Sequence, residues 1–171
     1  MPYLILFLLF SIPLLIFTLI RPHPYRFSRF VAFESVLGLL FLNAEVWFYD
    51  PFSPRQIVSW GLLFGSLILV VYGFYMLRVA GAPEGDVENT TQLVTSGIYR
   101  YIRHPLYGSL ILFGAGAFLK SPSFWGTGAL ILLCISAFIT AKTEEKNNLD
   151  QFGEEYQAYM GKTKMFIPFL F

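Results

Sequence analysis

The sequence predicts an all-α integral membrane protein with about five transmembrane helices. Hydrophobic residues make up 56% of the 171-residue chain and charged residues only 13%, whereas charged residues form about a quarter of a typical soluble domain. Mean hydropathy is +0.59. Apolar runs close to the roughly 20 residues that a spanning helix needs recur along the whole chain. These observations exclude an ordinary soluble domain.

Each expected helix corresponds to one apolar run, and the runs lie at residues 3–20, 30–49, 57–77, 106–119 and 124–141. The fourth run is short, so its flanks must contribute if it is to cross a bilayer. The first run has no basic residue before it and no small-residue cleavage site after it. We therefore expect an anchor that stays in the mature protein rather than a removable signal.

The distribution of basic residues predicts how the chain is oriented. Two of the 12 Lys and Arg residues, Arg55 and Lys120, fall on one side of the predicted membrane. The other ten fall on the opposite side: Arg21, Arg26, Arg29, Arg78, Arg100, Arg103, Lys142, Lys146, Lys162 and Lys164. The positive-inside rule then places the N-terminus outside and the C-terminus in the cytoplasm.

We expect a single domain covering residues 1–171, because no repeat or long linker interrupts the chain. Residues 1–80 would hold three transmembrane helices, and residues 81–171 a long polar loop, a helical hairpin and a C-terminal amphipathic segment. The tight turn at residues 120–123 predicts the hairpin. Near the C-terminus, apolar residues recur at helical spacing, which predicts the amphipathic helix: Leu149, Phe152, Tyr156 and Tyr159.

Residues that could carry chemistry gather in a polar, aromatic and basic patch at residues 95–107. Pro105 suits the first position of a helix. The free N–H groups there, together with Arg103, favour an anion such as a carboxylate or phosphate. Alternatively, the basic residues of the patch are interfacial anchors. The apolar tail at residues 165–171 is too short to span and is expected to cover part of the protein.

The aromatic and acidic candidates allow two interpretations each. Tyr99 and Tyr107 are either belt aromatics of the membrane interface or ring faces for an adenine or a sulfonium cation. Glu144 and Glu145 follow the fifth apolar run, where a solvated pair is the usual explanation. The functional interpretation is that one carboxylate points inward to hold ribose hydroxyls or an amino group.

Ionisable residues inside the second apolar run are also candidates, since burying them costs about 2.5 kcal/mol or more. Glu34 could pair with Arg29, and Glu45 has no obvious partner; both could instead be structural. Two histidines and the single Cys134 provide neither a disulfide framework nor a zinc cluster. We expect no metal and no nucleic acid among the ligands.

In its C-terminal half the chain resembles the isoprenylcysteine carboxyl methyltransferases and their prokaryotic relatives. The resemblance rests on the segment LVTSGIYRYIRHPLY at residues 93–107, then a hairpin, then Glu144-Glu145 and the segment FGEEY at residues 152–156. The ordered combination is far more specific than any one piece.

The resemblance implies a membrane methyltransferase that binds S-adenosylmethionine in a cytoplasmic pocket. By position, the residues implied to bind this cofactor are Gln92, Leu93, Val94, Tyr99, His104, Pro105, Leu106 and Tyr107, with Glu144 contacting the cofactor and Glu145 as its alternative. His104 is a possible catalytic group. Arg103 and Thr140 are candidates for substrate contact. Thr140 stands where prenylcysteine-specific members have an arginine, which puts prenylcysteine itself in doubt.

A lipophilic carboxylate is the expected methyl acceptor, because it is already ionised at neutral pH and in-line transfer then needs mainly alignment. A phospholipid or other lipid amine is an alternative, with His104 or a glutamate as the base. An NADPH-dependent sterol or lipid reductase is the nearest rival, although a 2′-phosphate favours arginine clusters over an acidic pair. A membrane scaffold or lipid-binding subunit is the non-enzymatic alternative.

Overall fold

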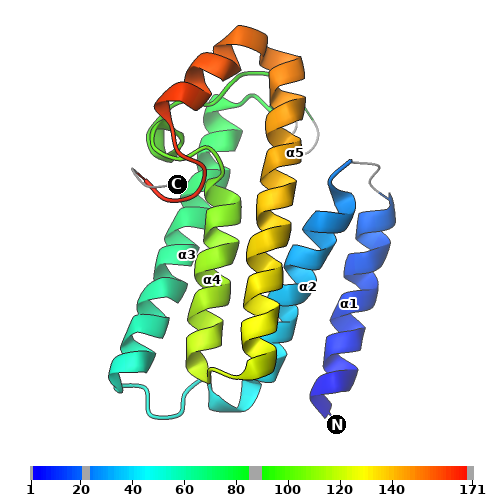
Figure 1. Cartoon of the computed structure of the whole chain (residues 1–171), viewed down its shortest axis with the longest axis vertical. Helices are drawn as coiled ribbons and strands as arrows, with labels where there is room; N and C mark the ends of the chain where they lie inside the picture. The colour runs from blue at the N-terminus through cyan, green and yellow to red at the C-terminus, as the bar shows by residue number, and fades with distance from the viewer. Residues whose placement is uncertain (1, 21–23, 85–89, 169–171) are drawn as a thin grey trace. The chain divides into compact units, whose positions relative to one another are not determined.

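The structure, a computed structural model, describes residues 2–20, 24–84 and 90–168. These residues form five α-helices and two short 3-10 helices (Figure 1), in the order α1 (Pro2–Ile20), α2 (Arg26–Leu42), η1 (Ala44–Val46), α3 (Pro54–Ala80), η2 (Gly97–Arg100), α4 (Pro105–Lys120) and α5 (Phe124–Lys162). The all-α prediction is therefore confirmed over the described ranges. Arg21, residues 85–89 of the polar loop and residues 169–171 of the tail lie outside them.

Helix boundaries follow local signals in the sequence. Helices α3 and α4 begin at Pro54 and Pro105, where a missing N–H is not needed. Helix α5 begins at Phe124 after Ser123, whose Oγ accepts a hydrogen bond of 3.1 Å from the backbone N–H of Gly126, as an N-cap does. The predicted hairpin between the fourth and fifth apolar runs is confirmed.

The second apolar run does not form one helix over residues 30–49. Helix α2 ends at Leu42, and Glu45 lies exposed in η1 instead of inside a span. The buried Asn43 side chain donates a 2.9 Å hydrogen bond from Nδ2 to the backbone oxygen of Leu39. Because that oxygen would otherwise serve the helix backbone, the asparagine ends the helix earlier than hydrophobicity predicts.

Among the described residues, the helices α3 and α5 are long and apolar enough to cross a membrane. Only 22% and 33% of their most apolar windows are buried, unlike the core helix of a soluble protein. Large side chains such as Phe64, Ile68 and Ile131 are exposed along them, a surface suited to lipid. Helix α4 and residues 5–18 of α1 are shorter apolar helices, so the number of five spans stays a prediction.

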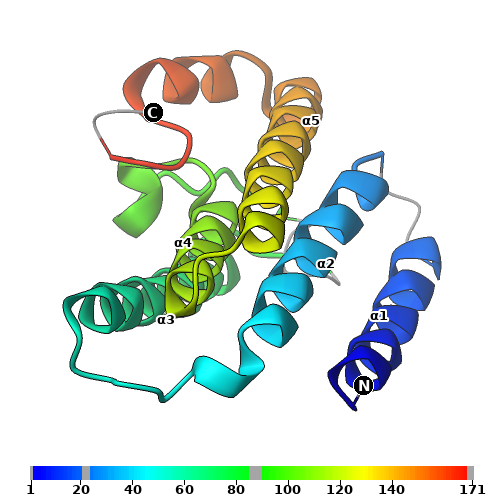
Figure 2. The same cartoon turned by 60° about the horizontal axis from the view of Figure 1, so that its bottom comes forward.

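The chain divides into two compact units, each made of two stretches. The first comprises residues 1–65 and 110–140, and its core contains Ala32, Leu39, Ala117 and Leu133. Helices α1 and α2 lie side by side in it (Figures 1 and 2). The Ser59 hydroxyl donates a 2.7 Å hydrogen bond to the backbone oxygen of Gly116.

Lys120 is buried in this first unit, although the sequence predicts it in the turn on the outer side of the membrane. Its ammonium lies 3.6 Å from the centre of the Trp60 ring and donates a 2.9 Å hydrogen bond to Oε1 of Gln56. The same ammonium lies 5.3 Å from the centre of the Trp47 ring. Cation–π attraction and the amide oxygen replace the water that the charge gives up.

The second unit comprises residues 66–109 and 141–171. Helix α5 reverses direction in it, visible as the orange-to-red turn in Figure 1, and Gly153 has the non-helical angles φ 56° and ψ −128°. The expected amphipathic helix is thus the distal part of α5. Tyr156 and Tyr159 are buried as predicted, whereas Leu149 is exposed.

Candidate functional site

The candidate site is built where α4 begins, and the C-terminal segment holds it there. The backbone N–H of Arg103 donates to the oxygen of Lys164 at 2.8 Å, and that of His104 donates to the oxygen of Met165 at 3.1 Å. Lys164 returns a bond of 3.1 Å to the oxygen of Tyr101. Met165 and Phe166 are buried, whereas Ile167 and Pro168 are exposed, so the start of the tail packs against the protein as expected.

Arg103 and Glu145 form a nearly buried ion pair. Nε and Nη2 of Arg103 both lie 2.8 Å from Oε1 of Glu145, and the two side chains are 9% and 4% exposed. Nη1 donates to the backbone oxygens of Met160 and Thr163. One guanidinium thus joins α5 to the turn that follows it, with hydrogen bonds strengthened by charge.

His104 lies between two carboxylates. Its Nδ1 is 3.6 Å from Oε2 of Glu144, and its Nε2 is 3.6 Å from Oε1 of Glu145. Burial disfavours a charged imidazole, but the two glutamates outweigh that effect and raise the pKa of His104 above its usual 6.5. At these distances the attraction is between charges, since hydrogen bonds are shorter.

Glu145 is correspondingly a weak base. Burial alone would raise its pKa, but His104, Lys142 and Arg103 together lower the pKa of Glu145 to about 2. Lys142 contributes from one turn away, with Nζ 2.9 Å from Oε2. The carboxylate is therefore ionised throughout the physiological pH range.

Glu144 faces the same cluster from the neighbouring position. The Tyr107 hydroxyl donates a hydrogen bond to Oε1 of Glu144, and 19% of the Glu144 side chain remains exposed. The buried Tyr107 ring lies 6.0 Å from the His104 ring. Both predicted glutamates therefore contact the predicted patch, each through its own partner.

Aromatic side chains enclose this cluster. The Tyr159 hydroxyl donates a 2.6 Å hydrogen bond to the backbone oxygen of Tyr99, and the Tyr156 and Tyr159 rings are 5.8 Å apart. Phe166 lies 6.2 Å from the His104 ring. Burial raises the pKa of the Tyr156 hydroxyl to about 12, so Tyr156 stays neutral.

The remaining predicted residues differ in burial and place. Val94, Tyr99 and Pro105 are buried, Leu93 and Leu106 are half-buried, and Gln92 is exposed. Thr140 belongs to the other unit. There it is buried, with hydrogen bonds from Oγ1 to Ser28 Oγ at 2.8 Å and to the oxygen of Ser136 at 2.7 Å.

Sequence reasoning placed an external anion at the start of α4, and the structure supplies the protein's own Glu145 there. It also missed the contributions of Lys142, Met160 and Thr163. Met160 acts through its backbone oxygen, and Thr163 through its backbone oxygen and, at 3.5 Å, its Oγ1. Because every residue has a backbone oxygen, the sequence gives no signal for the backbone contacts. Lys142 had one available signal, its spacing of three residues from Glu145 on a helix.

Comparison with protein families agrees with this geometry. The family model described as phospholipid methyltransferase matches residues 54–155, which is more than half of the chain and includes α4 and both glutamates. The chain belongs to the phospholipid methyltransferase family. The name of the family indicates methyl transfer, which favours the methyltransferase interpretation over the reductase and scaffold interpretations.

Curated relatives in this family include both O- and S-methyltransferases. Methanethiol S-methyltransferase 1 of Bradyrhizobium diazoefficiens is 27% identical over 163 residues, covering 85% of this chain and 55% of the relative. The probable protein-S-isoprenylcysteine O-methyltransferase of Oryza sativa subsp. japonica is 26% identical over 153 residues, covering 84% and 80%. The methanethiol S-methyltransferase of a Pseudomonas species is 32% identical over 148 residues, covering 78% and 55%.

The chain thus spans about half the length of the two bacterial relatives. The resemblance to isoprenylcysteine carboxyl methyltransferases, drawn from residues 93–107 and the acidic pair, is confirmed by the rice relative and by a human one that is 29% identical over 135 residues.

Proposed function

We propose that the protein is an S-adenosylmethionine-dependent membrane methyltransferase whose acceptor is a lipophilic carboxylate. Family membership supports methyl transfer. The choice of a carboxylate rests on one observation, the shifted pKa values of His104 and Glu145, which make both side chains poor general bases at neutral pH.

His104 and Glu145 are both poor general bases, for opposite reasons. His104 carries a raised pKa and is therefore protonated further into the neutral range than an ordinary histidine. Glu145, with a pKa of about 2, has little affinity for a proton. An amine or a thiol acceptor must lose a proton near neutral pH, whereas a carboxylate is ionised already. The acceptor that needs no base fits this site best.

The side chains of the site also suit the cofactor that the resemblance implies. S-adenosylmethionine supplies a methyl group on a sulfonium centre, together with an ammonium, a carboxylate, a ribose and an adenine. Glu144, partly exposed and oriented by Tyr107, can accept hydrogen bonds from ribose or ammonium groups. The ring of Tyr107 can face adenine or the sulfonium. Nε2 of His104, a buried nitrogen without a hydrogen-bond partner in the described part of the chain, supplies a further polar contact.

The remaining residues align and dehydrate the reacting groups. Arg103 fixes Glu145 against the C-terminal segment, and Met165 and Phe166 exclude water on that side. Methyl transfer to a carboxylate gains most of its rate from such alignment and exclusion of water. The acceptor is an amphiphile that enters from the bilayer, with its carboxylate reaching the cytoplasmic face and its tail between helices.

A comparison of methyl acceptors tests the proposal. Purified protein in nanodiscs is given a radiolabelled methyl donor with one of three matched long-chain acceptors: a thioether acid, an amine or a thiol. We expect label on the acid, recovered as methanol after mild alkaline hydrolysis, because methyl esters are base-labile and N-methyl and S-methyl products are not. Short, water-soluble analogues should be used poorly.

The other outcomes are equally informative. Base-stable label on the amine would move the function to lipid N-methylation, and label on the thiol would move it toward the S-methyltransferase relatives. Preference for a short analogue would overturn entry from the bilayer. A melting-temperature rise with NADPH and none with S-adenosylmethionine would overturn methyl transfer itself.

A further inference from the structure

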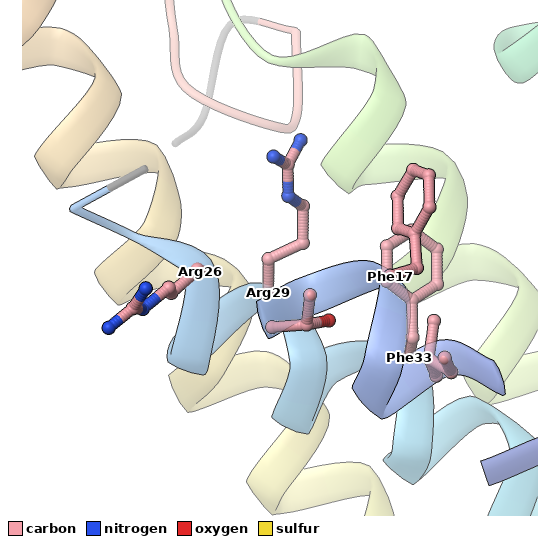
Figure 3. Close-up of a pocket in the computed structure, with 6 residues that line it drawn as sticks. Phe17, Arg26, Arg29 and Phe33 are labelled. Carbon is pink, nitrogen blue, oxygen red and sulfur yellow. The ribbon is translucent and has the colours of Figure 1, made fainter. Parts of the chain in front are cut away.

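The recess between α1 and α2 in the first unit is too small for an organic ligand. Its cavity volume of about 20 Å³ holds about one water molecule. Figure 3 shows side chains that line it: Phe17, Arg26, Arg29 and Phe33. In the second unit, by contrast, Gln151 and Tyr159 contact the segment that the resemblance implies to bind the methyl donor, and the proposed chemistry does not use either side chain. Both lie in the C-terminal half of α5.

The segment at residues 90–99 depends on contacts from elsewhere in the fold. Residues 91–96 form neither helix nor strand, and the short helix η2 begins only at Gly97. Leu93 and Val94, which the resemblance implies to bind the cofactor, lie in this irregular stretch. Because backbone freedom is costly to remove, such a stretch keeps one conformation only where other contacts hold it.

The start of the segment is held from two sides. The backbone N–H groups of Thr91 and Gln92 donate to the oxygen of Gly81 at 3.0 and 3.2 Å, which ties the segment to the end of α3. From α5, Nε2 of Gln151 donates a 2.9 Å hydrogen bond to the backbone oxygen of Thr90. This contact joins residues that are 61 positions apart in the sequence.

The end of the segment is held by the same helix (Figure 1). The hydroxyl of the buried Tyr159 donates a 2.6 Å hydrogen bond to the backbone oxygen of the buried Tyr99. Tyr159 is itself fixed, because its backbone oxygen accepts a 2.8 Å hydrogen bond from Oγ1 of Thr163. Removing the hydroxyl would deprive the oxygen of Tyr99 of this bond in a setting with little water to replace it.

We infer that Gln151 and Tyr159 are positioning residues for the methyl donor. They hold the two ends of residues 90–99 on α5, so that Leu93, Val94 and Tyr99 keep the arrangement that binds the donor. A segment that is ordered before binding loses less conformational entropy when the ligand arrives, which raises affinity. The inference rests on the proposed function, since it takes the donor to be S-adenosylmethionine.

Removing one donor group at a time tests the inference. Tyr159→Phe removes only the hydroxyl, and Gln151→Glu keeps the shape of the side chain but replaces the donating nitrogen with oxygen. We expect the dissociation constant for S-adenosylmethionine, measured by calorimetric titration of the full chain in nanodiscs, to rise about tenfold in Tyr159→Phe. It should rise about threefold in Gln151→Glu, whose hydrogen bond is exposed.

Steady-state kinetics separate positioning from catalysis. With the long-chain acceptor that the wild type methylates, KM for the donor should rise in both variants, and kcat should change by less than about twofold. Gln151→Lys restores a nitrogen donor and should regain most of the affinity that Gln151→Glu loses.

Two matched controls make the same chemical changes at exposed positions. Tyr75→Phe removes a hydroxyl on α3, and Gln157→Glu adds a carboxylate on α5. Both should bind the donor as the wild type does. Equal losses of affinity in Gln151→Glu and Gln157→Glu would show an effect of charge and overturn the inference for Gln151.

The remaining outcomes distinguish this inference from the proposed function. An unchanged dissociation constant in Tyr159→Phe, even with a lower melting temperature, would assign the hydroxyl to folding alone and overturn the inference for Tyr159. Gln151→Glu, at an exposed position, provides the test even where Tyr159→Phe does not fold. Absence of binding by the wild type would overturn the proposed function together with the inference.

Discussion

Arg103 and Glu145, 42 residues apart in the sequence, are joined by two contacts of 2.8 Å in a nearly solvent-free setting. The same guanidinium binds backbone oxygens of the C-terminal segment. Arg103 therefore holds both the Glu145 carboxylate and the backbone around Met160 and Thr163 in place. Together with His104 and Lys142, Arg103 also lowers the pKa of Glu145 against the effect of burial, so Glu145 is ionised and is a poor base.

Removal of this pair should destabilise the protein. Arg103→Gln leaves the buried Glu145 carboxylate without its guanidinium partner, and removing one member of a buried pair typically costs about 3 kcal/mol or more. Denaturant unfolding in detergent measures the loss. Arg100→Gln, at an exposed position nearby, should stay within about 0.5 kcal/mol of wild type.

The double variant Arg103→Gln/Glu145→Gln should recover part of the lost stability, because the orphaned charge is gone. Additive losses in the double variant would contradict a direct pairing between the two residues.

Cofactor affinity should depend on Glu144 and Tyr107. Glu144→Ala or Tyr107→Ala removes one partner of a hydrogen bond in the site, which typically costs about 1 to 3 kcal/mol, or on the order of tenfold to a hundredfold in affinity. Glu154→Ala, at an exposed position, should have little effect. Calorimetric titration with S-adenosylmethionine decides, and equal affinities for all three variants would remove Glu144 from the site.

The contribution of His104 to the free energy of unfolding should decrease as pH rises above 6.5. A folded-state pKa raised above 6.5 means that the charged imidazole contributes fully below pH 6.5, and that this contribution is lost as pH rises through the folded pKa. The stability difference between wild type and His104→Gln should therefore shrink above pH 6.5.

Glu145 gives stability the opposite dependence on pH, at the acidic end of the range. Its contribution is present above pH 4.5 and is lost as pH falls from 4.5 toward about 2. Melting temperatures measured from about pH 2 to pH 9 cover both limbs and provide the check. A difference between wild type and His104→Gln that does not vary with pH would rule out an imidazolium between the two glutamates.

The turn within α5 should require glycine at position 153. Its φ of 56° and ψ of −128° fall where other residues are strained, at a cost of about 1 to 3 kcal/mol. Gly153→Ala should destabilise the protein although the added carbon would meet no neighbour within 4 Å.

Gly161→Ala is the matched control for that turn. It also adds a methyl group to open space, but in ordinary helical backbone, where alanine is favoured. Thermal unfolding of both variants would contradict the strain argument if their melting temperatures were equal.

The orientation across the membrane can be tested with introduced cysteines. In a Cys134→Ala background, Lys162→Cys should react with a membrane-impermeant maleimide only after the cells are opened, because the positive-inside rule places it in the cytoplasm. Phe52→Cys, in the exposed turn before α3, should react in intact cells. Labelling of the Lys162→Cys variant from outside would reverse the topology.

The sequence by itself determined the helical class and the starts of the last two helices. Pro105 and the turn before Phe124 set the starts of α4 and α5, because capping and proline geometry act within a few residues. Residues 93–107 and the two adjacent glutamates identified the family through residue identity and order, which needs no coordinates.

Tertiary structure alone decided how these parts are partnered. Charge counts cannot show that Arg103 binds Glu145 and backbone oxygens, or that Glu144 accepts a hydrogen bond from Tyr107. They also cannot show that the buried Lys120 ammonium lies over the Trp60 ring. Each choice depends on which side chains packing brings within a few ångströms across tens of residues of sequence. Local periodicity contains no information about these contacts, so the pKa shifts of His104 and Glu145 could be argued only from the folded chain.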